Sequence, residues 1–270
     1  MRLLNSLWTG ASRFGLRRDH LLVQTLALQL AAKNGNSPLF ATDKHGEILA
    51  REMGWTVQVE RWLDDIPRAG LRHVWALGKL HALAKSPFPV LQFDGDVLML
   101  EPLPTWFTQA GIVAQSVDYP HGYAHDHMVE FRQICGYSET WKPYNCGLVG
   151  GNDHDLVRRY ATAAISKARL LAEFTEYGTG VSMTLEQWSL GEHEPTVLDA
   201  GHPYYCDFLG RPYAHLAGER KQKPDVLRDV ELTLAAEFPQ ALDALNEGCD
   251  RILGTVNHPL HRYLLGGQLR

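Results

Sequence analysis

The chain has 270 residues, of which 45% are hydrophobic and 21% charged, which is the balance of a globular protein with a buried core. Its formal net charge of −5 lacks the basic footprint of a nucleic-acid-binding protein. The four cysteines have no Cys-x-x-Cys spacing, and no apolar stretch is long enough for a signal peptide or a membrane span, so we expect a cytoplasmic protein with reduced thiols.

Apolar runs alternate with amphipathic segments along the first hundred residues, and turn residues such as Gly, Asn and Pro separate them. Short apolar runs of this kind predict buried strands, and the longer segments predict helices. The predicted strands are Leu3–Thr9, Leu39–Asp43, Trp55–Val59 and Val90–Phe93. The predicted helices are His20–Asn34, Gly46–Met53 and Leu71–Ala84.

The second half of the chain continues the alternation with a strand at residues 147–150, helices from about Asp153 and Thr184, and a helical segment at residues 225–253. Strands that alternate with helices predict an α/β fold with a mostly parallel central sheet flanked by helices. We expect a single domain over residues 1–270, with residues 225–270 as a C-terminal helical segment packed on it. Ligands of such sheets bind at the carboxyl ends of the strands.

Asp94-Gly95-Asp96 directly follows the predicted strand Val90–Phe93. Side chains at positions i and i+2 of an extended chain point to the same side, so the two carboxylates converge. Gly95 lets the backbone come close to a ligand. Hard oxygen ligands suit Mn²⁺ or Mg²⁺, which can bridge a diphosphate, although Asp-Gly-Asp also occurs in plain turns.

His215 and Lys221 lie in a second motif, His-x-x-Gly-x-x-Lys, near the C-terminus. An imidazole can complete a carboxylate site for a metal such as Mn²⁺. Gly218 would let main-chain N–H groups reach phosphate oxygens, and the Lys221 ammonium would neutralise a departing phosphate. The alternative for an isolated His and Lys is a solvated loop.

Two further polar positions complete the candidate site. Asn145 stands at the start of the later strand, and its amide can both donate to and accept from a sugar hydroxyl. Glu186 and Gln187 lie in the predicted helix near Thr184, where a carboxylate and an amide could face a sugar ring. Taken separately, Asn145 fits a turn equally well, and a Glu-Gln pair on a helix is usually a solvated face.

In chain order, Asp-x-Asp, Asn-x-Gly, acid-Gln and His-x-x-Gly-x-x-Lys resemble the motif series of glycosyltransferase family 8, the group of glycogenin and the bacterial lipooligosaccharide galactosyltransferases. The resemblance implies a GT-A fold and a Mn²⁺ (or Mg²⁺) ion held by Asp94, Asp96 and His215. It also implies diphosphate contacts from Gly218 and Lys221.

The resemblance assigns further residues to the nucleotide-sugar donor. Lys79 matches the basic residue that the family directs at the donor, and Trp8 and Thr9 fall where such enzymes contact the base and ribose. Asp43 is a weaker candidate nearby, and Asn145, Glu186 and Gln187 match the sugar-side residues. The chain departs from the family by carrying Glu186 in place of Asp and by lacking an immediate Pro-Trp after Lys221.

These features predict an enzyme that moves a hexose from a nucleotide-diphosphate sugar, expected to be UDP-linked, to an acceptor hydroxyl, of which a glycan is one source. The resemblance favours retention of anomeric configuration. A sugar nucleotidyltransferase is an alternative, although Thr9–Arg13 is only a faint version of its glycine-rich loop. A non-catalytic nucleotide-sugar-binding protein is a second alternative.

A histidine-rich stretch, with His121, His125 and His127 around Asp126, has no recognised metal-ligand spacing. An acceptor-facing or solvated loop is therefore the favoured interpretation over a second metal site. Several tryptophans could stack on a sugar acceptor, but most are expected to pack in the core. They are Trp55, Trp62, Trp75 and Trp106.

Overall fold

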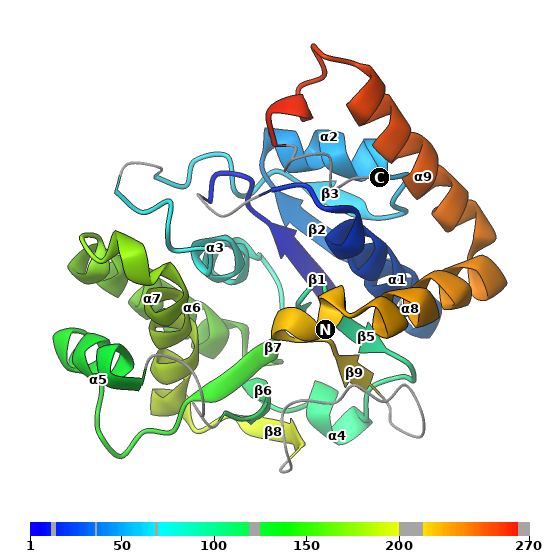
Figure 1. The fold of residues 1–270 in the computed structure, drawn as a ribbon. Coiled ribbons are helices and arrows are strands. Elements are labelled where there is room, and N and C mark those ends of the chain that lie inside the picture. Colours follow the sequence, from blue (N-terminus) through cyan, green and yellow to red (C-terminus); the bar gives the residue numbers. More distant parts are fainter. Residues whose placement is uncertain (12–14, 36, 68–69, 119–124, 200–212, 264–270) are drawn as a thin grey trace.

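The computed structural model describes residues 1–11, 15–35, 37–67, 70–118, 125–199 and 213–263. The centre of this part of the chain is a seven-stranded sheet with helices on both faces (Figure 1). Neighbouring strands run parallel, except that β7 is antiparallel to both β4 and β6. In spatial order the strands are β3 (Gln58–Glu60), β2 (Leu39–Thr42), β1 (Arg2–Leu7), β4 (Val90–Phe93), β7 (Tyr144–Gly150), β6 (Val113–Val117) and β8 (Thr196–Asp199).

Helices fill the connections between these strands. The longer ones are α1 (Arg18–Asn34), α2 (Lys44–Glu52), α3 (Leu77–Lys85), α5 (His125–Ile134), α6 (His154–Lys167), α8 (Pro224–Glu237) and α9 (Pro239–Gly254). The shorter ones are α4 (Thr105–Thr108), α7 (Gly178–Met183), the π-helical turn η3 (Thr184–Trp188) and the 3₁₀ turns η1 (Ala168–Leu171), η2 (Thr175–Tyr177), η4 (Gly191–His193), η5 (Gly218–Gln222) and η6 (His261–Tyr263).

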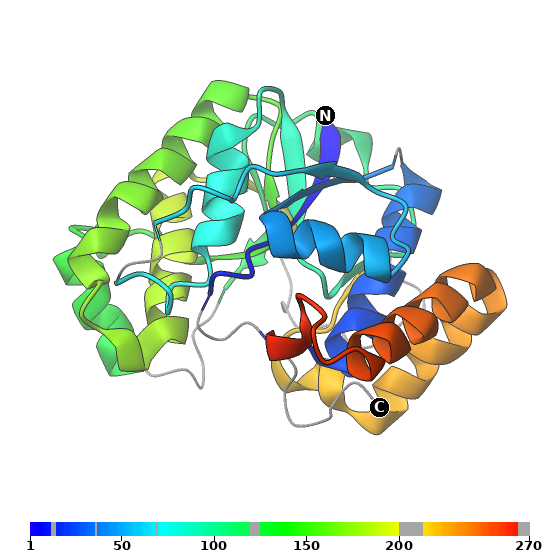
Figure 2. The same ribbon diagram turned by 90° about the horizontal axis from the view of Figure 1, so that it is seen from above.

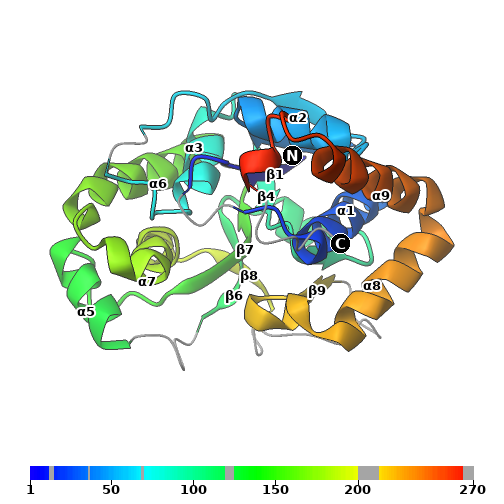
Figure 3. The same ribbon diagram turned by 45° about the horizontal axis from the view of Figure 1, so that its top comes forward.

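The sheet separates two hydrophobic cores, because successive side chains of a strand point to opposite faces. Leu39 and Ala41 of β2 belong to the core beneath α3 and α6, whereas Phe40 between them belongs to the core beneath α1, α8 and α9. Figures 2 and 3 show the same division, with α3 and α6 on one side of the sheet and α1, α8 and α9 on the other. Burial on both faces explains why these strands are continuous apolar runs.

The predicted fold class is confirmed, and the strands predicted around Leu39–Asp43 and Val90–Phe93 are present as β2 and β4. The helix predicted at Leu71–Ala84 is wrong at its start, because α3 begins only at Leu77. Residues 71–76 form successive turns, with Val74 N–H donating to the Leu71 carbonyl at 3.0 Å. Leu71, Val74 and Ala76 are buried, so their apolar spacing reflects tertiary packing.

The helical segment predicted at residues 225–253 is two helices, α8 and α9, which meet at Phe238 and Pro239. Proline lacks the N–H that would continue the hydrogen bonding of α8, and it is well placed in the first turn of α9. Both helices pack against α1. No helix in the described part of the chain has both the length and the apolar character that crossing a membrane requires.

A small two-stranded sheet lies beside the main one. Its strands, β5 (Val97–Met99) and β9 (Tyr213–His215), run antiparallel, with Val97 opposite His215. Because β5 starts only three residues after Asp94, this pairing brings the end of β9 against the carboxyl end of β4. The main-chain N–H of Leu216 donates to the Asp96 carbonyl at 2.9 Å and closes the pairing.

Candidate active site

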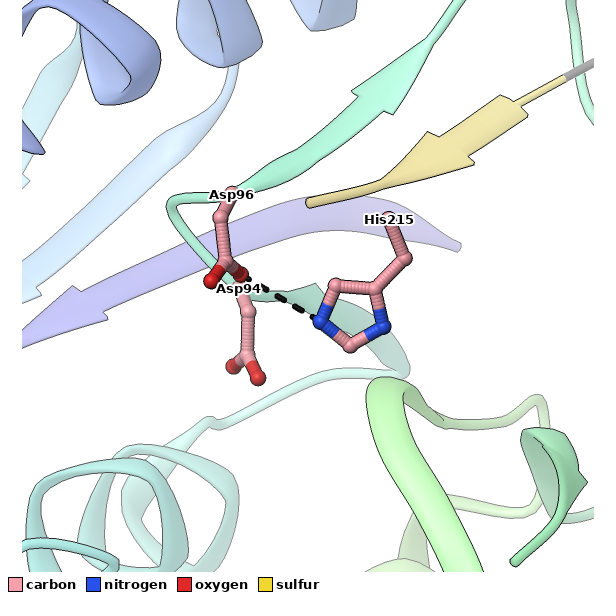
Figure 4. A group of neighbouring side chains, drawn as sticks. All are labelled: Asp94, Asp96 and His215. Atoms are coloured by element: carbon pink, nitrogen blue, oxygen red, sulfur yellow. Dashed lines mark ion pairs between the residues drawn. The ribbon is translucent and has the colours of Figure 1, made fainter. Parts of the chain in front are cut away.

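Asp94, Asp96 and His215 come together at the carboxyl end of β4. The turn between β4 and β5 holds the two aspartates, since Asp94 N–H donates to the Gly147 carbonyl at 2.9 Å and Val97 N–H donates to the Asp94 carbonyl at 3.0 Å. The β5–β9 pairing delivers the histidine. One ligand atom from each of the three side chains lies within 4.8 Å of the others. Figure 4 shows the Nε2 atom of His215 turned toward Asp96, at 3.4 Å from Oδ1.

This donor set fits the ion that the sequence predicted. Two carboxylates and one imidazole on elements fixed by backbone hydrogen bonds match the oxygen and nitrogen ligands of Mn²⁺, and the carboxylates alone would suit Mg²⁺. His215 and Asp96 are shielded, with side-chain exposures of 6% and 13%, and Asp94 is more open at 28%. An ion here would therefore have one accessible side, where substrate oxygens could complete its coordination.

Lys221 reaches this group from η5. Its Nζ lies 2.6 Å from Oδ2 of Asp96. Burial would raise the pKa of Asp96, but the charge of Lys221 and the hydrogen bond from His215 outweigh it, so the pKa is well below its usual range. Burial would likewise lower the pKa of Lys221, yet the Asp96 charge raises it overall. Both groups are thus charged at neutral pH, and the ammonium stands next to the metal ligands.

Gly218 opens η5 with φ of +65°, in the left-handed region that favours glycine. The residue turns the chain from the end of β9 into η5, which then directs Lys221 back toward Asp96. Gly218 and Lys221 both line the cleft described below. The His-x-x-Gly-x-x-Lys spacing is therefore the spacing that this turn requires.

Lys79 lies on the opposite side of Asp94 and is 5% exposed. Its Nζ contacts Oδ1 of Asp94 at 2.7 Å and Oε2 of Glu186 at 3.2 Å, and it donates to the Cys146 carbonyl at 2.8 Å. The ammonium donates a hydrogen bond to the Cys146 carbonyl and forms ion pairs with both carboxylates. Lys79 thus ties the metal-ligand group to Glu186, and its predicted contact with the donor stays a prediction.

Glu186 and Gln187 lie on η3, directly after α7, and both are buried. The Glu186 carbonyl accepts from the Tyr160 hydroxyl at 2.8 Å, which fixes the turn against α6. Burial raises the pKa of Glu186, Lys79 lowers it and the Asp94 charge raises it again, so the pKa stays above its usual range. Single π-helical turns inside helices recur at functional sites, and this one places a carboxyl and an amide in the cleft.

Asn145 and Gly147 stand at the edge of β7 that faces the cleft. The Asn145 Oδ1 atom accepts from the Gly147 N–H at 2.9 Å, which fixes the orientation of the amide. A Cβ atom on Gly147 would lie 2.8 Å from Nδ1 of His215, closer than real Cβ contacts allow. A glycine in the Asn-x-Gly motif therefore leaves the room that the His215 ring needs to lie against β7.

The residues at the end of β1 differ from Asp94, Asp96 and His215 in how they relate to the cleft. Trp8 is buried and lines the cleft. Thr9 and Asp43 bind each other, with the Thr9 hydroxyl 2.8 Å from Oδ2 of Asp43, and Asp43 also accepts from the Gly46 N–H at the start of α2. Neither Thr9 nor Asp43 is among the residues that line the cleft. Their predicted contacts with the donor stay predictions.

One cleft of about 660 Å³ joins these groups, a size within the range of about 300 to 1,000 Å³ found for small-molecule sites. It brings together eleven of the residues predicted from the sequence. They are Trp8, Lys79, Asp94, Gly95, Asp96, Asn145, Glu186, Gln187, His215, Gly218 and Lys221.

The cleft also contains residues that the sequence did not single out. Asp118 follows β6 and is buried, and its N–H donates to the Pro143 carbonyl at 2.9 Å. His20 and Gln24 face the cleft from α1, and Trp75, expected in the core, lines it from the turns before α3. No local pattern in the sequence pointed to Asp118, because β6 is a five-residue strand with a polar centre. The helix that contains His20 was predicted, but not that His20 and Gln24 on this helix would face the cleft.

The histidine-rich stretch remains largely outside the described residues, which exclude His121 and the side chains of His125 and Asp126. The ring of His127 contacts that of Tyr177, with centroids 4.1 Å apart. The stretch Thr9–Arg13, compared above with a glycine-rich loop, also runs into residues 12–14, which are not described. The acceptor-facing role of the histidines stays a prediction.

Residues 1–170 match the model of a family of unknown function, DUF6734. The chain belongs to this family. No curated protein matches the DUF6734 chain. Two solved structures that it resembles are of LgtC. One is the galactosyltransferase LgtC in complex with donor and acceptor sugar analogs, at 14% identity over 98% of this chain and 100% of that chain, with a TM-score of 0.48.

The second is an active-site mutant of LgtC, at 13% identity over 87% of this chain and 96% of that chain, with a TM-score of 0.49. The contacts of the cleft remain the basis for assigning a role to each residue.

Proposed function

We propose that this protein is a metal-dependent glycosyltransferase that moves a hexose from a nucleotide-diphosphate sugar to an acceptor hydroxyl. One observation supports this most: the cleft holds a carboxylate–carboxylate–imidazole group with a lysine on one side and a buried carboxyl–amide pair on the other. The first part suits a diphosphate and the second suits a sugar ring. Transfer of the sugar between them requires both parts in one cleft.

On the diphosphate side, a divalent ion bound by Asp94, Asp96 and His215 would supply positive charge that neutralises the departing diphosphate. Lys221, which is 2.6 Å from Asp96, adds a second positive charge at that place. Its charge counts most when the bond to the sugar breaks, because the negative charge on the leaving group grows at that moment. Gly218 lets the main chain of η5 approach the phosphate oxygens.

On the sugar side, Asn145 and Gln187 offer amides for hydroxyl groups, and Glu186 offers a carboxylate. The ion pair with Lys79 restricts where the Glu186 carboxylate can lie. A restrained carboxylate is suited to stabilise positive charge at the anomeric carbon or to attack it, and both fit a reaction with retention. Glu186 has one methylene more than the family's Asp, so this role requires a main chain that lies differently here, and Glu186 stands on the π-helical turn η3.

We further propose UDP as the nucleotide of the donor, a hydroxyl of a glycan or similar molecule as the acceptor, and residues 1–270 as one catalytic domain. The two cores on either side of a single sheet support one domain. Proton NMR of the product tests retention: an α-linked donor should give an α-linked product, whereas a β-linked product would overturn retention and make Glu186 a candidate base.

Release of UDP from UDP-hexoses in the presence of Mn²⁺ tests the proposed function. The wild-type protein should release UDP slowly without an acceptor, and Asp96→Asn should abolish the release. Asp155→Asn is the matched control, because Asp155 lies on α6 and its Arg158 partner is exposed. Metal-dependent UDP binding with no release from any UDP-hexose would instead indicate the non-catalytic binding protein, and pyrophosphate-dependent formation of UTP would indicate the nucleotidyltransferase.

A further inference from the structure

His215 has one ring nitrogen turned to the metal group and one turned away from it. Figure 4 shows Nε2 facing Asp96, while Nδ1 points to the other side of the ring. Nδ1 is buried and makes no hydrogen bond within the described residues. A histidine that binds a metal through Nε2 carries its proton on Nδ1, and such protons are almost always donated to an acceptor that fixes the ring. The buried Nδ1 therefore needs an acceptor once the ion is bound.

Gln115 of β6 reaches the same place from the other side of β7. A Cβ atom on Gly147 would lie 2.8 Å from Nδ1 of His215 and 2.3 Å from Oε1 of Gln115. Both side chains thus border the space above the Cα of Gly147 that a Cβ atom would fill. Gln115 is fully buried, and its amide oxygen has two lone pairs, so it can accept from Nδ1 in addition to any other contact.

The pairing of β6 with β7 explains how Gln115 comes to this position. Ala114 pairs with Val149 and Ser116 with Asn145, so the register shifts at Gln115, opposite the segment that contains Gly147. Irregularities of this kind redirect a side chain and occur often beside active sites. This irregularity therefore includes both the Asn-x-Gly motif on β7 and Gln115 on β6.

We propose that Gln115 is a positioning residue, which accepts a hydrogen bond from Nδ1 of His215 and thereby holds Nε2 toward the divalent ion. The inference rests on the metal site of the proposed function, but it concerns metal binding and can be tested without turnover. The neutral imidazole of His215 would hold the ion through the lone pair of Nε2, and its Nδ1 would donate the remaining ring proton to Oε1 of Gln115.

Titration of Mn²⁺ alone into the full-length protein, followed by the electron paramagnetic resonance of the free ion, tests the proposal. Gln115→Met keeps the length of the side chain and removes the acceptor, and it should weaken Mn²⁺ binding by about 10- to 100-fold. Gln115→Glu keeps an acceptor and should bind Mn²⁺ at least as well as the wild type. Gln92→Met is the matched control, because Gln92 is a buried amide of β4 that contacts Ser6 and not His215, and it should leave Mn²⁺ affinity unchanged.

Three outcomes would overturn the role of Gln115. They are unchanged Mn²⁺ affinity in Gln115→Met, an equal loss in Gln92→Met, and an equal loss in Gln115→Met and Gln115→Glu. The unfolding temperature of each variant shows that the folded protein is being titrated. Release of UDP from the donor is measured on the wild type in parallel. If the wild type binds Mn²⁺ but releases no UDP, the proposed function is refuted and the role of Gln115 stands. If the wild type releases UDP but Gln115→Met binds Mn²⁺ as well as the wild type, the role of Gln115 is refuted and the proposed function stands.

Discussion

Replacement of Lys79 by methionine should destabilise the protein in a way that depends on pH. Lys79 is 5% exposed, and its Nζ lies 2.7 Å from Asp94 and 3.2 Å from Glu186. Removing one partner of a buried ion pair costs about 3 to 5 kcal/mol, because the other charge is left buried and uncompensated. Here two carboxylates lose the same counter-ion, so we expect a loss of about 3 to 5 kcal/mol at pH 8.

The expected pH dependence follows from Glu186. Burial raises its pKa, Lys79 lowers it and Asp94 raises it, so Lys79→Met should raise the pKa further above the ordinary value of about 4.3. A carboxyl whose pKa is higher in the folded than in the unfolded protein binds its proton more tightly when folded. The contribution of this carboxyl to the free energy of unfolding is therefore fully present below about pH 4.3, and it is lost as the pH rises through the folded-state pKa. The loss in the variant should be smaller at pH 5 than at pH 8.

Urea unfolding of wild type and variant at pH 5 and pH 8 measures this difference. Lys33→Met is the matched control, since Lys33 is 55% exposed and its Nζ lies 2.7 Å from Glu237, a surface pair expected to contribute at most about 1 kcal/mol at either pH. The double variant Lys79→Met/Glu186→Gln should recover part of the loss at pH 8. An equal loss at both pH values, or one no larger than that of Lys33→Met, would refute the reasoning.

Three other changes probe separate parts of the structure. Lys221→Ala should lower kcat of donor cleavage by about 100-fold and UDP affinity by less, and equal losses in steady-state kinetics and calorimetry would contradict a role in the departure of the diphosphate. Gly147→Ala places a Cβ 2.8 Å from Nδ1 of His215 and should slow UDP release by about 100-fold, so wild-type rates would show that the ring is not fixed there. Burial would raise the pKa of Glu52, but Arg251 and His258 lower it overall. The ion pair between Glu52 and Arg251 therefore stabilises the protein above about pH 4.3, and its contribution is lost as the pH falls. Arg251→Met should therefore cost up to about 1 kcal/mol at pH 7 and less at pH 3 in urea unfolding, where the hydrogen bond from Arg251 to the Glu52 carbonyl still counts, and an undiminished cost at pH 3 would exclude the ion pair as its source.

The elements that the sequence predicted best are those whose signals are local. Leu39–Thr42 and Val90–Phe93 are short apolar runs bounded by turn residues, and both are strands buried on two faces. Because residues that follow such strands share one edge of the sheet, Asp94 and Asp96 could be placed at that edge from spacing alone, although the same spacing also fits a plain turn. His215 could be grouped with the two aspartates only because its motif resembles that of glycosyltransferase family 8, since no local sequence pattern predicts the pairing of β5 with β9.

What the sequence did not predict depends on contacts between distant segments. The turns at residues 71–76 have helical apolar spacing, but packing of Leu71, Val74 and Ala76 fixes them in another conformation. The resemblance predicts Lys79 as a basic residue directed at the donor, whereas its three partners come from the turn after β4, from β7 and from η3. Gln115 is a polar residue within a short strand, and only the register of β6 with β7 brings it to His215.

The central claim is that Asp94, Asp96 and His215 hold a divalent ion against a nucleotide diphosphate. Pulsed electron paramagnetic resonance of the protein with Mn²⁺ and UDP tests it most directly, because the spectrum reports the nuclei bound to the ion. The account predicts coupling to ³¹P of the diphosphate together with coupling to an imidazole ¹⁴N that disappears in His215→Asn. Coupling to ³¹P without the ¹⁴N coupling in the wild type would mean that the ion is held by the nucleotide alone, and it would contradict the account.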